Sequence, residues 1–289
     1  MRISFIGTTQ IAEKFAAHIF NYAKEQQINS DYYKLKLGGF YCFPTTEVTR
    51  IALPLNCKIY VNLEDMVEDN DIIGILCTEN KIKQFVNCFS KLKVKNKIFF
   101  HLSNKFNCDI LNNGYENTCA SLYSLINFQT TVPNKISDYP FVMEGTGDKL
   151  KEFATILNEN GFNVSCVSRA NAQTFLAASK MLEMNLVSAL SSANTAIMAS
   201  TGISLNSYSP ILKRIMDMML TDRDGYINKG IAKHLNALTV DSYFKSIGRL
   251  DMPDYTKMNK YACDICTRLS DIKNDDKQEI GLVTKKHCR

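Results

Sequence analysis

One short turn near the N-terminus constrains the fold more than any other part of the chain. Arg2–Ile6 is an apolar run of one strand's length, and Gly7–Thr9 follows it directly. From Gln10 to about Gln26, apolar residues recur at helical spacing. A glycine between a strand and the start of a helix is typical of the βα turn in dinucleotide-binding folds. We therefore expect the chain to begin with a Rossmann-type βαβ unit.

The rest of the first half alternates short apolar runs with helical segments, which predicts a parallel sheet covered by helices. Further strands are expected at Gly39–Phe43, Lys58–Val61, Asp71–Cys77, Lys97–Leu102, Thr118–Leu122, Phe141–Glu144 and Asn163–Val167.

The sequence changes character after about Arg169. Ala170–Ser200 has no Pro or Gly and is rich in Ala, Leu and Met, which predicts one long helix. The fold class is therefore α/β, with a Rossmann-type parallel-sheet domain over residues 1–169 and an all-helical C-terminal domain over residues 170–289. Further helices are expected at Ser209–Leu220, Asn228–Leu238, Val240–Arg249 and Asp254–Asp271.

The turn itself indicates how a dinucleotide would be held. Gly7 gives the tight turn, and backbone N–H groups at the helix start would bind the pyrophosphate. Thr9 stands where a second glycine is usual, so its Cβ must be accommodated, and the hydroxyls of Thr8 and Thr9 could donate to a phosphate. A turn of this shape that binds no dinucleotide is the alternative. The predicted cofactor-binding residues of the turn are Gly7, Thr8, Thr9, Gln10 and Ile11.

The end of the second strand bears on the choice between NAD and NADP. No Asp or Glu stands between Phe40 and Thr45 to hold the ribose hydroxyls of NAD. Thr45, Arg50 and Lys36 are compatible with a 2′-phosphate, and Phe43 could support the adenine. NADP is therefore the expected cofactor, and NAD is less favoured.

Charge and hydropathy exclude other classes of partner. The net charge of +5 is spread along the chain, and its densest cluster, Lys91–Lys97, lacks the interleaved aromatic residues of a nucleic-acid-binding face. No apolar run is long enough to span a membrane, and Met1–Gly7 does not begin a signal peptide. We expect no nucleic acid, no membrane and a cytoplasmic location.

The ten cysteines do not indicate a metal site or disulfides. Most stand in apolar segments, where reduced cysteines act as small core residues. Cys263 and Cys266 form a CxxC pair, but neither a second such pair nor a His pair accompanies it. We expect no bound metal.

Several segments, in this order and spacing, resemble a Rossmann-like oxidoreductase family related to ketopantoate reductase and pyrroline-5-carboxylate reductase. The helical domain of that family is similar to the C-terminal domain of 6-phosphogluconate dehydrogenase. The resemblance spans nearly the whole chain. The segments are the Gly7 turn, Asp71–Asn80, His101–Ser103, Ser121–Phe128, the helix containing Asn185, and Ala232–Leu238.

The resemblance implies where the nicotinamide end of the cofactor lies. The loop after the fourth strand, with Thr78 and Glu79, would lie beside the nicotinamide ribose, and His101 and Ser103 would lie nearby. A histidine at a strand end is more often a structural hydrogen-bonding residue, so that interpretation stays open for His101.

The chain departs from the family at several positions. It has Tyr123-Ser124 in place of a His-Pro pair, and apolar residues around Phe175–Ala177 in place of a Tyr-His pair. Thr221–Gly225 and its neighbours replace Gly-Pro and Arg-Gly-Asp elements. Any chemistry that depends on those groups cannot be transferred to this chain.

The remaining catalytic candidates come from the long helix and from Tyr123. In related reductases a lysine and an asparagine on this helix polarise and protonate the substrate, which implies Lys180 as proton donor and Asn185 as the residue that orients the substrate. Tyr123 could add a hydroxyl. A solvated Lys180 is the alternative interpretation, and His234 is expected to be a core or interface residue.

Two functions follow. The first is an NADPH-dependent reductase of a small carbonyl or imine metabolite that carries a carboxylate, with the site between the two domains. The second is a non-catalytic dinucleotide sensor or protein-interaction module, which the lost pairs and the altered turn favour. The resemblance also implies a homodimer formed through the helical domain.

Overall fold

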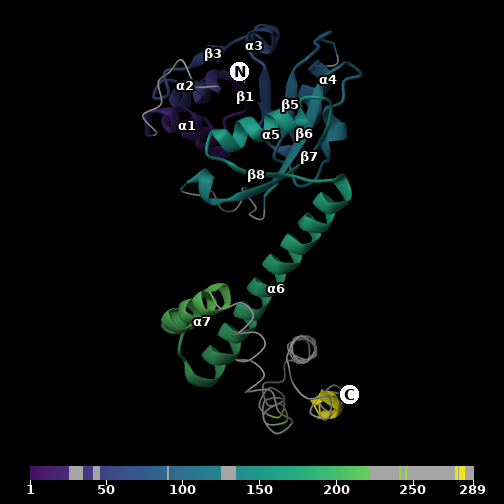
Figure 1. Ribbon diagram of the computed structural model, residues 1–289. Helices are drawn as coiled ribbons and strands as arrows, with labels where there is room; N and C mark the ends of the chain where they lie inside the picture. The colour runs from purple at the N-terminus through teal and green to yellow at the C-terminus, as the bar shows by residue number, and fades with distance from the viewer. Residues whose placement is uncertain are drawn as a thin grey trace. The chain divides into compact units, whose positions relative to one another are not determined.

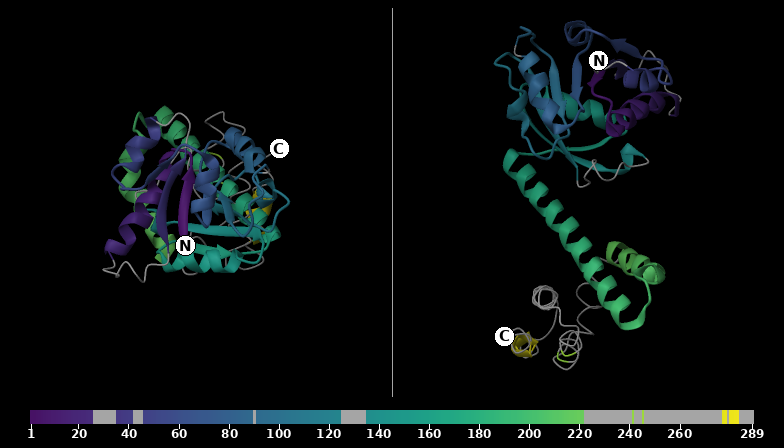
Figure 2. Two further views of the ribbon diagram at one scale, coloured as in Figure 1. Left: turned by 90° about the horizontal axis from the view of Figure 1, so that it is seen from above. Right: turned by 180° about the vertical axis from the view of Figure 1, so that it is seen from behind.

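The computed structural model describes residues 1–25, 35–41, 46–89, 91–124 and 135–221, together with residues 241, 245, 277–278 and 280–283. Over this part of the chain it contains one sheet in the strand order β3-β2-β1-β4-β5-β6-β7-β8. Figure 1 labels most of these strands, and Figure 2 shows the same ribbon from above and from behind. The strands are β1 (Arg2–Ile6), β2 (Lys36–Tyr41), β3 (Lys58–Tyr60), β4 (Ile72–Ile75), β5 (Ile98–His101), β6 (Thr118–Ser124), β7 (Pro140–Thr146) and β8 (Asn163–Cys166).

The first six strands form the expected parallel sheet. Neighbours in the order β3-β2-β1-β4-β5-β6 are all parallel. Every expected strand is present, although β2 begins at Lys36 rather than Gly39 and its expected end at Phe43 lies outside the described residues. The Rossmann-type α/β fold is thus confirmed.

The last two strands reverse direction, which the expectation of a parallel sheet did not include. β7 pairs antiparallel with β6, from Cys119 opposite Thr146 to Ser124 opposite Phe141, and β8 is parallel to β7. An antiparallel neighbour needs no helical crossover. The sheet is therefore mixed, with a parallel majority.

Helices cover both faces of the sheet because its strands are apolar on both sides. One buried cluster joins the sheet to α1 (Gln10–Glu25), α2 (Thr46–Ala52) and α5 (Leu150–Glu159). The other joins it to α3 (Leu63–Asp69), α4 (Glu79–Phe89) and the 3-10 turn η1 (Cys108–Leu111). Phe5 and Phe15 stack edge to face at 6.4 Å between their ring centroids, which ties α1 to β1.

The outer edge of β8 is closed by a side chain. Val167 N donates to the carbonyl of Met143 on β7. Because successive residues of a strand point their backbone N–H and C=O groups to opposite sides, those of Val164 point away from β7. The amide of Asn158, on α5, donates to Val164 O at 2.9 Å and accepts from Val164 N at 2.8 Å. Asn158 thus satisfies backbone groups that another strand would otherwise pair with.

The chain divides into two units, Met1–Glu183 and Met184–Arg289. Past β8, the described elements are the helix α6 (Arg169–Thr201), the 3-10 turn η3 (Leu205–Tyr208) and the helix α7 (Ser209–Thr221). They match the expected Ala170–Ser200 and Ser209–Leu220. The other expected helices lie almost entirely outside the described residues. Among the helices that the structure describes, none has the length and apolarity to cross a bilayer.

Candidate functional site

The two halves of the parallel sheet diverge at neighbouring strands, β1 and β4. The chain leaves β1 toward α1 and β4 toward α4, which pack on opposite faces of the sheet. In open α/β sheets, ligands bind outside the carboxyl ends of the strands at such a switch point. The candidate site is therefore the set of loops that follow β1, β4 and β5.

Gly7 makes the turn at the end of β1. Its φ is +105°, and its N–H donates to the carbonyl of Tyr41 at 2.9 Å. A Cβ at this position would lie 2.7 Å from the carbonyl oxygen of Leu76, a backbone atom that cannot move aside. Backbone conformation and lack of space both require glycine here, as the sequence pattern indicated.

Thr9 caps the helix that follows. Its hydroxyl donates to Leu76 O at 2.6 Å and accepts from Ala12 N at 3.4 Å, while its carbonyl accepts from Glu13 N at 3.1 Å. The hydroxyl proton is thus directed at Leu76 and not at a phosphate site. Gln10 and Ile11 follow it in the first turn of α1, where helix geometry gives their N–H groups no partner within the helix.

The loops after β4 and β5 are joined by a hydrogen bond between two of the predicted residues. Ser103 Oγ donates to Glu79 Oε1 at 2.9 Å and accepts from the backbone N–H of Lys105 at 3.1 Å. Thr78 is exposed beside them. The structure therefore brings Glu79 and Ser103 together at the edge of the sheet where β1 also ends.

His101 is buried and fully engaged. Its Nδ1 accepts from Ser103 N at 3.1 Å, so the neutral ring carries its proton on Nε2, which faces Asn107 O at 3.2 Å and Ser121 Oγ at 3.1 Å. Burial lowers its pKa from the usual 6.5 to about 4. His101 is thus a neutral group that holds the loop after β5, which agrees with the structural interpretation left open for it.

Tyr123 is also engaged inside the protein. Its hydroxyl lies 3.1 Å from Phe106 O and 3.2 Å from Glu144 Oε1, and its side chain is buried. Burial, followed by the neighbouring carboxylate, raises its pKa well above the usual value. A phenol in this environment gives up its proton less readily than a free tyrosine.

Glu144 is the centre of a polar cluster that the sequence did not reveal. This carboxylate on β7 is 1% exposed and accepts from Cys108 N at 2.8 Å and from Arg169 Nε at 3.4 Å. Arg169, the first residue of α6, also makes two bonds of 2.6 and 2.7 Å to Asp109. The one feature of the sequence that pointed to this cluster is the charged residue directly after the apolar run Phe141–Met143.

The candidates on α6 are exposed. Lys180 belongs to the first unit and Asn185 to the second, and both side chains face solvent. The apolar residues Leu182 and Leu186, near Asn185 on the same helix, are exposed as well. Phe43, Thr45 and His234 lie outside the described residues, as do Cys263 and Cys266.

The other residues considered for a 2′-phosphate lie at the surface. Arg50 Nη2 pairs with Glu13 Oε2 at 3.3 Å, and both side chains are largely exposed. Lys36 is exposed as well. Neither residue is held toward a defined ligand position.

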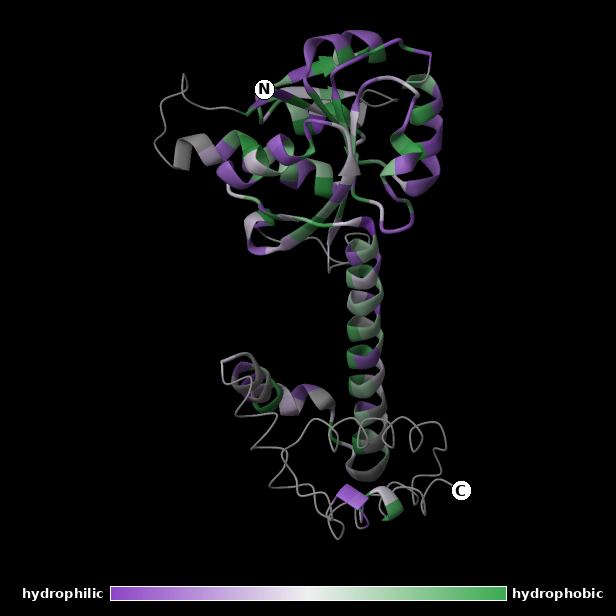
Figure 3. Cartoon of the chain, turned by 45° about the vertical axis from the view of Figure 1, so that its right-hand side comes forward, coloured by the Kyte–Doolittle hydropathy of each residue, from purple (hydrophilic) through white to green (hydrophobic). Residues whose placement is uncertain are grey.

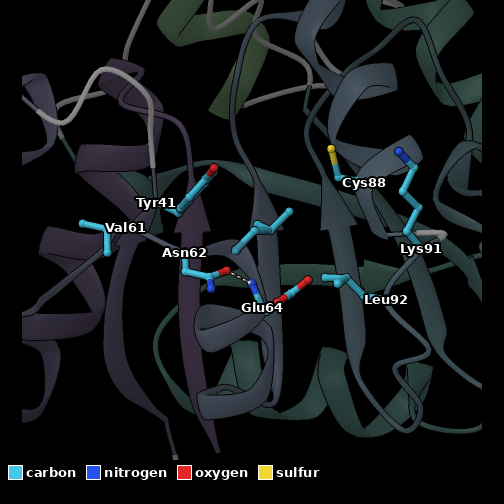
Figure 4. A pocket seen from close by; sticks show the side chains of 8 residues that line it. Tyr41, Val61, Asn62, Glu64, Cys88, Lys91 and Leu92 are labelled. Carbon is cyan, nitrogen blue, oxygen red and sulfur yellow. Dashed lines mark hydrogen bonds between the residues drawn. The ribbon is translucent and has the colours of Figure 1, made fainter.

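A pocket of about 470 Å³ opens beside the ends of β2 and β3 (Figure 4). Asn62 caps α3 on its floor by accepting from Glu64 N at 2.8 Å. Tyr41, which lines the pocket, accepts the Gly7 N–H through its carbonyl, so this residue links the pocket wall to the Gly7 turn. Its lining residues are Tyr41, Val61, Asn62, Leu63, Glu64, Cys88, Lys91 and Leu92.

Comparison with known proteins shows the fold. No protein-family model matches the sequence. No curated protein matches it either.

Solved structures resemble the chain along its length. A protein of Thermotoga maritima is 13% identical, with a TM-score of 0.63 over 99% of this chain and 100% of that one. The imine reductase of Streptomyces aurantiacus is 9% identical, with a TM-score of 0.60 over 100% of both chains. The reductive aminase of Aspergillus terreus, solved with NADPH and ethyl-5-oxohexanoate, is 11% identical, with a TM-score of 0.54 over 98% of this chain and 92% of that one. At these identities the likeness establishes a shared fold, the Rossmann-type α/β fold with a helical C-terminal part that the sequence indicated.

Proposed function

We propose that the chain is an NADPH-dependent reductase of a small carbonyl or imine compound that carries a carboxylate. The observation that carries the proposal is the Gly7 turn. This turn lies at the switch point of a sheet with the Rossmann strand order, and the N-terminus of α1 follows it directly. The solved imine reductases and the reductive aminase share this fold, which supports the reaction class.

The residues of the turn fit a dinucleotide. Gly7 has no Cβ, which would lie too close to the carbonyl oxygen of Leu76. The N–H groups of Gln10 and Ile11 have no acceptor within the helix. These groups would hold the pyrophosphate, and the pocket beside Tyr41 would take the adenosine end. When bound, NADPH supplies the hydride, so the protein has only to orient the substrate and provide a proton.

The proton donor proposed here is Lys180. Tyr123 is a poor candidate because burial raises its pKa and because its hydroxyl is directed at Phe106 and Glu144. Lys180 is exposed, which is the solvated state named above as the alternative, so this role requires the bound substrate to cover its ammonium group. Asn185 would orient the carbonyl or imine group through its amide.

The second candidate function is a non-catalytic dinucleotide sensor or interaction module. It is favoured by the fact that Thr9, His101 and Tyr123 all direct their polar atoms at groups of the protein itself. A sensor would bind NADPH without reducing a substrate, whereas an interaction module need not bind the dinucleotide.

We further propose a homodimer located in the cytoplasm. α6 carries exposed apolar side chains over several turns, and Figure 3 shows apolar stretches along this helix. Large apolar surfaces of this kind are usually covered by a partner. The residues are Met181, Leu182, Met184, Leu186, Val187 and Met198.

The test is titration of the full chain with NADPH and with NADH, followed by nicotinamide fluorescence and thermal stability. Binding to the folded state must raise the apparent stability. Tight NADPH binding with turnover of 2-oxo acids or cyclic imines supports the reductase, and binding without turnover supports the sensor. Absence of binding at millimolar cofactor contradicts the reductase and the sensor and favours the protein-interaction module.

A further inference from the structure

Two lysines converge on one aromatic ring beside the candidate site. Lys83 Nζ lies 5.5 Å from the centroid of the Phe106 ring, and Lys105 Nζ lies 6.0 Å from the same centroid. Lys83 comes from α4 and Lys105 from the loop after β5, so two separate elements each bring a positive charge near the same ring.

The position of these lysines is fixed by the contacts already described. Lys83 stands one helical turn after Glu79, and residues four apart lie on the same face of a helix. Lys105 N–H bonds to Ser103 Oγ, which bonds to Glu79. The lysines therefore lie near the Glu79–Ser103 contact, where the family resemblance implies the nicotinamide end of the cofactor.

Nearby carboxylates in the described part of the chain form no ion pair with these lysines. Glu79 accepts from Ser103 but keeps its negative charge, and Asp109 is held by Arg169. Within the described residues, neither Lys83 nor Lys105 has an acidic partner within ion-pair distance. A small anion beside the Phe106 ring would be attracted by the ammonium groups of both lysines.

We propose that Lys83 and Lys105 bind the carboxylate of the substrate, with the Phe106 ring as the surface on which it rests. The proposal rests on the reductase function above and deepens it, because it makes these lysines the residues that select anionic over neutral substrates. Lysine recognises oxyanions as a point charge, so a carboxylate of any small oxo or imino acid satisfies the site.

The experiment measures oxalate binding to the NADPH-loaded full chain by calorimetry. Oxalate is a small dicarboxylate that lacks a reducible ketone or imine. The variants are Lys83→Met and Lys105→Met, which keep an unbranched side chain on the ring, and Lys81→Met, which removes one exposed charge from the same helix away from Phe106. We expect oxalate affinity to fall at least about tenfold in the first two variants and to stay unchanged in the third.

Equal oxalate affinity in all variants, or no oxalate binding by the unmodified chain, would overturn the proposal. So would a loss of NADPH affinity in Lys83→Met and Lys105→Met, since the lysines would then hold a phosphate of the cofactor. If the chain fails to bind NADPH, oxalate is titrated into the free protein. Binding there that still requires both lysines would support the anion site while contradicting the reductase function.

Discussion

At the scale of single residues, the first turn of α1 allows ligand binding to be separated from folding. Gln10 is exposed at the first helical position, where a carboxylate is favourable to the helix. The Gln10→Glu variant should therefore fold as stably as the original chain, yet bind NADPH about tenfold more weakly because its charge repels the pyrophosphate. Fluorescence titration and thermal unfolding measure the two properties.

The matched control is Asn21→Asp, which adds the same charge to an exposed position near the other end of α1. It should leave the NADPH affinity unchanged. If both variants weaken binding equally, the effect is one of total charge, and the pyrophosphate is not held at this turn.

His101 gives a second prediction, on the pH dependence of stability. Its pKa is lowered to about 4 in the folded state, so the unfolded chain takes up a proton at higher pH than the folded one. This contribution to stability is present above about pH 6.5 and is lost as the pH falls toward 4, by up to about 3 kcal/mol. Urea unfolding at pH 7.5 and at pH 5 measures it.

His101→Gln serves as the comparison, since glutamine does not titrate. The variant is expected to be less stable at pH 7.5 but to lose less of its free energy of unfolding between the two pH values. A pH dependence as steep as that of the original chain would show that other groups cause it.

At the scale of elements, the cluster around Glu144 joins η1, β6, β7 and the start of α6. Removing one partner of a buried pair leaves the other charge without compensation. Because the Arg169 side chain is 40% exposed and keeps Asp109, the cost of Glu144→Ala should be moderate, about 2–3 kcal/mol by urea unfolding.

Asp109→Ala provides the control. Asp109 is bound by the same arginine, but its own side chain is 54% exposed. It should cost less than about 1 kcal/mol. Similar losses in the two variants would mean that burial of Glu144 does not govern the strength of this cluster.

Much of the architecture could be predicted from the sequence, because apolar runs and helical spacing mark elements locally. The reversal of β7 could not, since such a run carries no sign of strand direction. At the site, the need for Gly7 was evident from its place between strand and helix. The surroundings of Tyr123 were not, because Glu144 meets it across the β6–β7 pairing and is itself bound by Arg169 from the start of α6.

At the scale of the whole molecule, the prediction concerns self-association. Sedimentation of the full chain is expected to show a dimer that dissociates when Leu182 and Val187, both exposed on α6, are changed to glutamate. Ser188→Glu adds charge to an exposed polar position of the same helix and should leave the dimer intact. A monomer in the unmodified chain would contradict the proposed homodimer.

The closed edge of β8 limits how copies of this chain can meet. Asn158 occupies both outward-facing polar groups of Val164, so another chain cannot extend the sheet there without first displacing that amide. An intermolecular β-sheet at this edge, and the fibrous assembly to which it can lead, is therefore opposed by a single asparagine. This protection exists only while α5 is folded against β8, so partial unfolding of α5 would expose the strand to aggregation.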